Sequence, residues 1–165
     1  MEIILTRNIW SDEARQASIA ARRASGAAGA KLDDYRARTR NGSQRMGHGL
    51  HADYAVYHAN RTYQGAYPWV AESHGLKGDT PNAIVHDKVM ERGDRDGAQG
   101  IRYLMVIHHQ AAALQHGLAG ATHQRAADSL KARGQSKKSA LHQEAANSHL
   151  RARQLHQKEA ESYRD

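Results

Sequence analysis

Histidine is the residue type in this sequence best suited to chemistry, because imidazole binds metals and exchanges protons near neutral pH. The chain has 165 residues, with 12 histidines and no cysteine. His48 and His51 stand three residues apart, with Asp53 close by. That spacing can bring two zinc ligands to one helix face, but glycines flank His48 and the glutamate of the HExxH motif is missing. A metal-dependent hydrolase or nuclease built on this segment is therefore the least favoured alternative. Further candidates for such a site are His58, His74 and the pair His86-Asp87.

Six other histidines repeat every seven residues in two C-terminal runs: His109, His116 and His123, then His142, His149 and His156. Leu130 and Tyr163 occupy the next positions of the two runs, so the histidine position belongs to the apolar face of each helix. Alanines usually follow three and four residues later and allow close approach of two helices. We therefore predict a helix–helix seam whose contacts are Ala112, His116, Ala119, His123 and Ala126 against Ala145, His149, Ala152 and His156.

Metal binding and pH sensing are the two functional alternatives for these histidines. Residues seven apart on one helix lie about 10.5 Å apart along its axis, too far to share one zinc ion. Two helices would approach a site if His116 faced His149, but further ligands would be needed. Protonation near pH 6 would put like charges into the seam and loosen it, provided that the rings are buried and neutral. Packing remains the favoured interpretation, and we predict no metal and no cofactor.

The elements that must position these residues are helical. Residues 98–132 and 138–163 have a helical pattern, and a short polar connection at 132–139 joins them. Such a pair folds back as an antiparallel hairpin. We predict an all-α protein with a helical and irregular region at 1–97 and a helical hairpin at 98–165.

The N-terminal region is expected to contain shorter elements. MEIILTR (1–7) favours an extended segment, with Ser11 as the N-cap of a helix that ends near Gly26. Residues 50–64 read as a helix, and another helix begins at Pro81 and ends at Gly93.

Composition argues against a thick apolar core and against several enzyme classes. Phe is absent, alanine supplies much of the apolar content, and nucleotide-binding glycine loops and the GxSxG elbow are missing. Either thin alanine-lined helix contacts hold such a fold together, or neighbouring subunits or a partner complete its core. The chain is expected to be non-enzymatic.

The net charge of +7 and the pI of about 9.9 favour anionic neighbours. Basic residues gather near the N-terminus and in the connection between the two long helices. The alternative function is therefore non-specific nucleic-acid binding, with candidate phosphate contacts at Arg36, Arg38, Arg40, Lys137 and Lys138.

The sequence shows no signal-peptide pattern and no apolar run near 18 residues, which predicts a soluble intracellular protein with no membrane partner.

HQRAADS (123–129), HQEAANS (142–148) and the opening IWSDEARQASIAARRA resemble helical segments of structural and morphogenesis proteins of tailed bacteriophages. The resemblance covers residues 9–25 and 105–163. It implies a virion component, such as a minor head, decoration or connector-associated protein, present in the host cytoplasm during assembly and then in the virion. The implied partners are further copies of the chain or other virion proteins. Some phage head proteins of this kind carry ADP-ribosyltransferase domains, whose arginine, serine and glutamate motifs are not recognisable here.

Overall fold

The structure is a computed structural model that describes residues 2–29, 48–65 and 67–164, with side chains from Asp12 onward in the first range and from Leu50 onward in the second. The described part is almost entirely helical, apart from short turns and one isolated bridge between Gln64 and Pro81. The helices are α1 (Glu2–Ala27), α3 (His48–Tyr63), α4 (Pro68–Ser73), α5 (Asn82–Glu91), α6 (Arg95–Ala132) and α7 (Ser136–Ser162).

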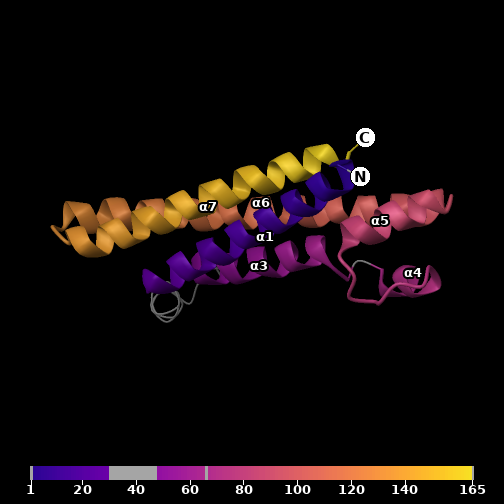
Figure 1. Ribbon diagram of the computed structural model, residues 1–165. Helices are drawn as coiled ribbons and strands as arrows, with labels where there is room; N and C mark the ends of the chain where they lie inside the picture. The colour runs from indigo at the N-terminus through magenta and orange to yellow at the C-terminus, as the bar shows by residue number, and fades with distance from the viewer. Residues whose placement is uncertain (1, 30–47, 66, 165) are drawn as a thin grey trace.

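The two longest helices, α6 and α7, form the antiparallel hairpin that the sequence predicts (Figure 1). The hairpin begins at Arg95, slightly before the expected start, because the Asp94 side chain caps α6 by accepting a hydrogen bond from the Gly97 amide. At the tip, Gly134 adopts a φ of 74°, a conformation that favours glycine, and so lets the chain reverse between the helices.

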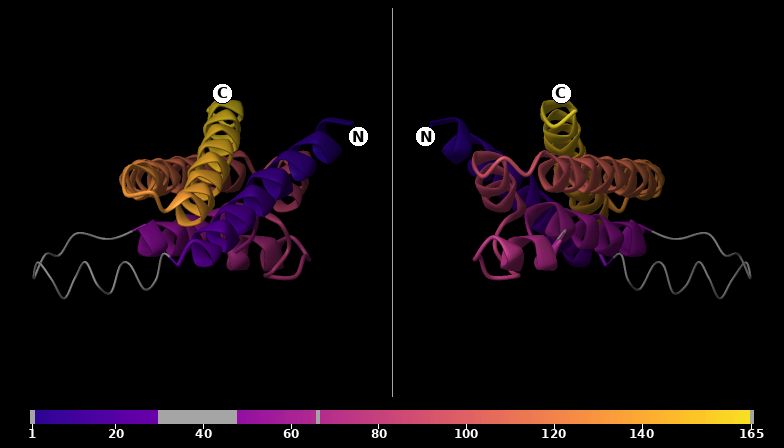
Figure 2. Two further views of the ribbon diagram at one scale, coloured as in Figure 1. Left: turned by 90° about the vertical axis from the view of Figure 1, so that its left-hand side faces the viewer. Right: turned by 90° about the vertical axis from the view of Figure 1, so that its right-hand side faces the viewer.

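Helices α1 and α3 pack on this hairpin to complete a bundle of four long helices (Figures 1 and 2). α1 packs against α7, α3 packs against α6, and α1 and α3 pack against each other. Hydrogen bonds join His51 to Gln115 and His58 to His108, so α3 runs opposite to α6. In the same way, contacts of Ser18 with His156 and of Ser25 with His149 show that α1 runs opposite to α7. Helices from the predicted 1–97 region thus cover the inner side of the 98–165 hairpin.

The start of α1 differs from the sequence-based expectation. The segment 1–7 was expected to be extended and Ser11 to cap a helix, but the helix begins at Glu2 and runs through Ser11 without a break. No proline or glycine occurs before Gly26, so nothing in the local sequence interrupts the helix. A continuous α1 is long enough to lie along both α3 and α7.

The interior changes character along the bundle. Near α4 and α5 the core is conventionally apolar and consists of Ala71, Val85, Val89, Ala98, Ile101, Met105 and Tyr163. α5 is held to the end of α3 by Asn82, whose amide donates to the carbonyl oxygens of Arg61 and Thr62. Further along, the buried apolar residues are mostly alanines, and the larger buried side chains are histidines and serines.

Candidate functional site

Three histidine pairs bridge α6 and α7 in the interior of the bundle. The Nδ1 atoms of His109 and His156 lie 2.9 Å apart, and the same distance separates those of His116 and His149 and those of His123 and His142. Each pair is a hydrogen bond in which one imidazole donates and the other accepts. The seven-residue repeat explains this register. Because α6 and α7 are antiparallel, a step of seven residues forward along α6 meets a step of seven residues backward along α7.

Two serines of α1 connect these pairs to one another. The Ser18 hydroxyl lies 2.7 Å from Nε2 of both His116 and His156. The Ser25 hydroxyl lies 2.8 Å from Nε2 of His123 and 2.7 Å from Nε2 of His149. Because α1 is parallel to α6 and antiparallel to α7, one serine per heptad reaches one ring on each helix.

The result is one continuous hydrogen-bonded chain, which we call the histidine–serine chain. It consists, in order, of His109, His156, Ser18, His116, His149, Ser25, His123 and His142. All eight residues are buried. Of the three helices that contribute to the histidine–serine chain, α7 packs against both α6 and α1 (Figure 1).

Burial keeps the imidazoles of His109, His116 and His156 neutral. Desolvation lowers the pKa of His156 to about 3, with a further contribution from His58. Desolvation also lowers the pKa values of His109 and His116 well below the ordinary value of 6.5, and neighbouring histidines lower them further. At neutral pH these rings therefore contribute hydrogen bonds but no charge.

Neutrality restricts the positions of the protons. A neutral imidazole has one N–H, and a serine hydroxyl has one proton, so a fully bonded chain must donate in one direction from end to end. A serine that accepted from both rings would leave its own buried proton unpaired, which is costly. Two arrangements remain: the α6 histidines all carry the proton on Nδ1 and the α7 histidines on Nε2, or the reverse.

The histidine–serine chain has the residue types of a catalytic serine–histidine pair, but a substrate cannot reach its side chains. Ser18, His116 and His156 are fully buried, and each hydroxyl lies between two rings. A substrate would have to separate the helices to reach either serine. The arrangement therefore specifies helix register, since slipping α1 by one residue would break both serine contacts.

The structure places eight of the nine predicted seam residues in the interior: Ala112, His116, Ala119, His123, Ala145, His149, Ala152 and His156. Ala126 is only half-buried. Gly120 allows close approach of the two helices, because an added Cβ would lie 3.4 Å from the His149 Cβ atom.

Sequence reasoning missed the serines of α1. Alanines are more numerous than serines in this helix, and of Ala14, Ala17, Ala21 and Ala24 only Ala14 and Ala21 are buried. The available signal was the spacing of Ser11, Ser18 and Ser25, which repeats the seven-residue interval of the histidines. The side chain of Ser11 lies outside the described part.

Those candidate enzyme residues whose side chains are described do not converge on one site. The side chain of His48 lies outside the described part, and His51 bonds through Nδ1 to the Gln115 amide oxygen at 2.6 Å. Asp53 borders a small hollow with Leu50 and two tyrosines.

The remaining candidate histidines have separate partners: His58 pairs with His108, His74 with Asp94, and His86 with Asp87. Partial burial lowers the pKa values of His58 and His108, and in His108 the charges of His58 and Arg61 add to the effect. Across the described residues, no three His, Asp or Glu side chains are grouped so that they could hold a metal ion.

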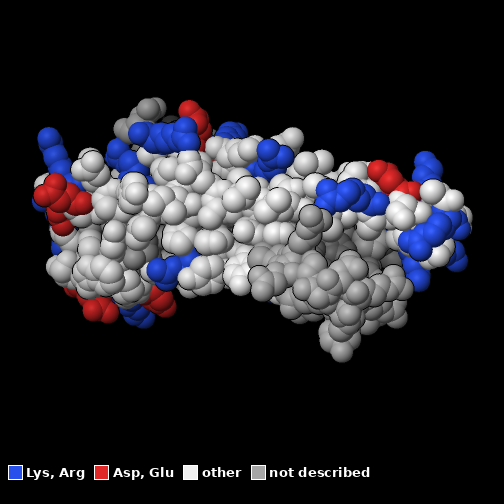
Figure 3. Space-filling view, turned by 180° about the vertical axis from the view of Figure 1, so that it is seen from behind, with Lys and Arg blue, Asp and Glu red and all other residues white. Residues whose placement is uncertain are grey.

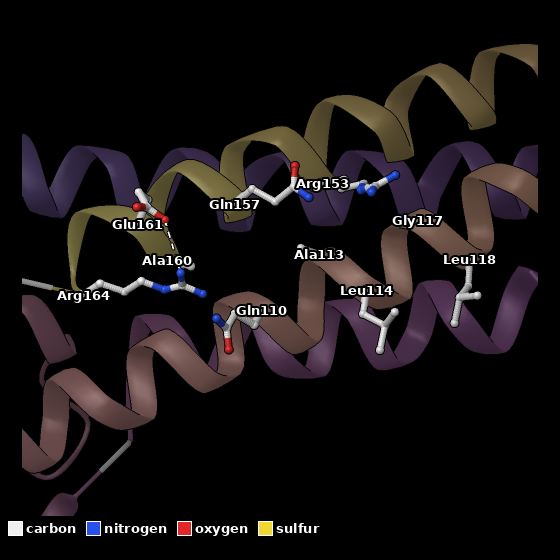
Figure 4. Close-up of a pocket in the computed structure, with 10 residues that line it drawn as sticks. All are labelled: Gln110, Ala113, Leu114, Gly117, Leu118, Arg153, Gln157, Ala160, Glu161 and Arg164. Carbon is white, nitrogen blue, oxygen red and sulfur yellow. Dashed lines mark ion pairs between the residues drawn. The ribbon is translucent and has the colours of Figure 1, made fainter.

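A groove with a volume of about 610 Å³ lies between α6 and α7 on the side away from α1 (Figure 4). Leu114 and Leu118 project from α6, and Arg153 and Gln157 project from α7. At one end Glu161 forms an ion pair with Arg164 at 3.6 Å. The groove thus has one apolar wall and one polar wall with charges of both signs.

The predicted phosphate contacts are only partly described. Lys137 and Lys138 are exposed in the first turn of α7, at the tip of the hairpin. Arg36, Arg38 and Arg40 lie outside the described residues.

The chain matches no protein-family model, and comparisons with curated proteins and with solved structures also give no match. None of the described helices combines the length and apolar character needed to cross a membrane.

Proposed function

We propose that this protein is a non-enzymatic assembly component that acts through protein–protein contacts on the outer side of its helical hairpin. In its specific form, which rests on the resemblance of the heptad segments to tailed-phage structural proteins, the protein is a virion component. The assembly role does not depend on that setting.

One observation carries the proposal: the apolar side chains on the outside of α6. Tyr103 is 65% exposed and Leu114 is 62% exposed, and Ile107 and Leu118 are exposed beside them. Large apolar side chains gathered on one helix face beside a groove are typical of an interaction surface. Figure 3, which views the molecule from behind, shows residues of both charges gathered towards the two ends of the described surface and fewer charged residues between them.

The interior supports the same proposal. The groups best suited to catalysis, the serine and histidine side chains of α1, α6 and α7, are buried and bonded to one another. They stabilise the scaffold and leave the outer surface to interact with a partner.

Site-specific photo-cross-linking in the organism that encodes the protein tests this proposal. A photoreactive amino acid at position 114 should cross-link to one discrete protein, either another copy or a different chain. The matched control is position 150, because Leu150 is also exposed, at 45%, but lies on α7 outside the groove. No discrete product from position 114, or equal products from both positions, would contradict the proposal.

Nucleic-acid binding is the second candidate function, and the exposed basic residues at the hairpin tip favour it. Lys131, Arg133, Lys137 and Lys138 are all exposed there. Retention on DNA should fall steeply with salt if these residues contact phosphates. Replacement of Lys137 and Lys138 by glutamate should then abolish retention on DNA. Unchanged retention would show that the hairpin tip does not bind DNA.

A further inference from the structure

The outer face of α6 has a spacing that reads the same in both directions. Its exposed apolar residues are Tyr103, Ile107, Leu114 and Leu118, at intervals of four, seven and four. Tyr103 and Leu118 are equally far from the midpoint between residues 110 and 111, and so are Ile107 and Leu114. A second α6 laid antiparallel across this midpoint would place Tyr103 against Leu118 and Ile107 against Leu114, twice each.

The polar residues beyond this apolar centre follow the same symmetry. Asp96 and Arg125 are both exposed and are equally far from the midpoint, so an antiparallel copy would bring opposite charges together at each end. A parallel copy would place Arg125 beside Arg125 and Asp96 beside Asp96. The charge pattern therefore selects the antiparallel orientation.

Shape adds a further match. Asp96, Gln99, Gly100 and Tyr103 border a shallow hollow of about 330 Å³ near the start of α6. The residues equally far from the midpoint on the other side include Leu118, Ala121 and Thr122, which would face that hollow in the second copy. Self-complementary surfaces of this kind generate a closed two-fold dimer.

We propose that α6 is the contact helix of a two-fold symmetric homodimer, in which the outer faces of two antiparallel α6 helices pack over Asp96 to Arg125. The contact covers about 44 Å of helix at 1.5 Å per residue. The occupant of the outer face is thus a second copy of this chain. This inference rests on the proposed function, whose interaction surface it assigns to self-association.

Sedimentation velocity across roughly 1 μM to 1 mM measures this association, because weak interfaces have dissociation constants in that range. The unmodified chain should change from monomer to dimer as its concentration rises. Leu118→Glu should weaken the dimer at least tenfold, because it buries a carboxylate in the apolar centre. Leu150→Glu, at a position of similar exposure (45% against 42%) on α7, should leave the dimer unchanged.

A charge exchange tests the orientation. Asp96→Arg alone and Arg125→Asp alone should each weaken self-association, because each brings like charges together at both ends. An equimolar mixture of the two variants should form a heterodimer about as tight as the original, because every Arg then meets an Asp. Circular dichroism of each variant checks that the helices are intact.

A monomer throughout the concentration range, a dimer insensitive to Leu118→Glu, or a mixture that fails to associate would overturn the homodimer. A monomer in solution together with cross-links from position 114 to a different protein would overturn the homodimer and leave the proposed function standing. A monomer with no discrete cross-link from position 114 would remove both.

Discussion

Each serine of the histidine–serine chain satisfies two buried ring nitrogens at once. Ser18 lies between His116 and His156, and Ser25 lies between His123 and His149. A buried polar group without a partner costs about 1–3 kcal/mol, whereas a satisfied one contributes modestly. The hydroxyls therefore matter mainly because their removal would leave two nitrogens unpaired.

Ser18→Ala should lower the free energy of unfolding by about 2–4 kcal/mol, because it leaves Nε2 of both His116 and His156 without a partner. Urea denaturation at neutral pH measures the change. Ser73→Ala is the matched control, since the Ser73 hydroxyl is exposed and bonds only to the Val70 carbonyl of its own helix. Equal effects of the two substitutions would contradict the role assigned to Ser18.

At the residue scale, the sequence predicted the buried histidines but not their partners. Leu130 and Tyr163 at the histidine position showed that this position faces the interior. Nothing local to the hairpin revealed that its histidines bond to serines 98 to 138 residues away. The partners follow only once α1 is docked in register on α6 and α7.

At the scale of the element, α6 has two working faces. Its inner face supplies His109, His116 and His123, and its outer face carries Tyr103 and Leu114. Gly117 and Gly120, in the middle of α6, face different neighbouring atoms. Gly120 faces the Cβ of His149 and the Ala146 carbonyl, whereas Gly117 faces only the flexible side chain of Arg153.

Gly117→Ala should therefore stabilise the protein by about 0.5–1 kcal/mol, because alanine is the better helix former and the arginine can move aside. An added Cβ at residue 117 would lie 3.5 Å from the nearest Arg153 atom, which is ordinary contact. Thermal denaturation with urea titration measures the gain. A loss of stability would mean that Arg153 is held more rigidly than its position on the groove wall implies.

The elements were predictable to different degrees for physical reasons. The α6–α7 hairpin has long uninterrupted periodicity and a polar connection, so its existence followed from the sequence. α1 was predicted too short, because an apolar run of a few residues does not separate strand from helix. The packing of α1 against α3 and α7 explains why a single long helix forms in this segment.

At the scale of the whole molecule, the buried neutral histidines make stability depend on pH. Above pH 6.5 these rings are neutral in the folded and the unfolded chain and contribute no pH dependence. As pH falls below 6.5, the unfolded chain binds protons that the folded chain excludes, so the stability present at neutral pH is lost. For His156 this loss continues until pH approaches its folded pKa of about 3.

The bundle should therefore lose stability in mild acid, at a pH above the range in which carboxylates titrate. His156, with its folded pKa of about 3, contributes a loss of about 2 kcal/mol by pH 5, and the lowered pKa values of His109 and His116 add to the loss. Helix content followed by circular dichroism during an acid titration measures the transition. Carboxylates titrate near pH 4, so a midpoint clearly above that value assigns the loss to histidine. Full helix content at about pH 4 would refute this prediction.

Six buried imidazoles and two hydroxyls should form one neutral hydrogen-bonded chain of a single direction. Two-bond 1H–15N NMR spectra of histidine-labelled protein at neutral pH report the protonation and tautomer of every ring. The expected result is six neutral buried rings, with His109, His116 and His123 sharing one tautomer and His142, His149 and His156 sharing the other. A charged ring among the six, or mixed tautomers within either helix, would contradict the chain.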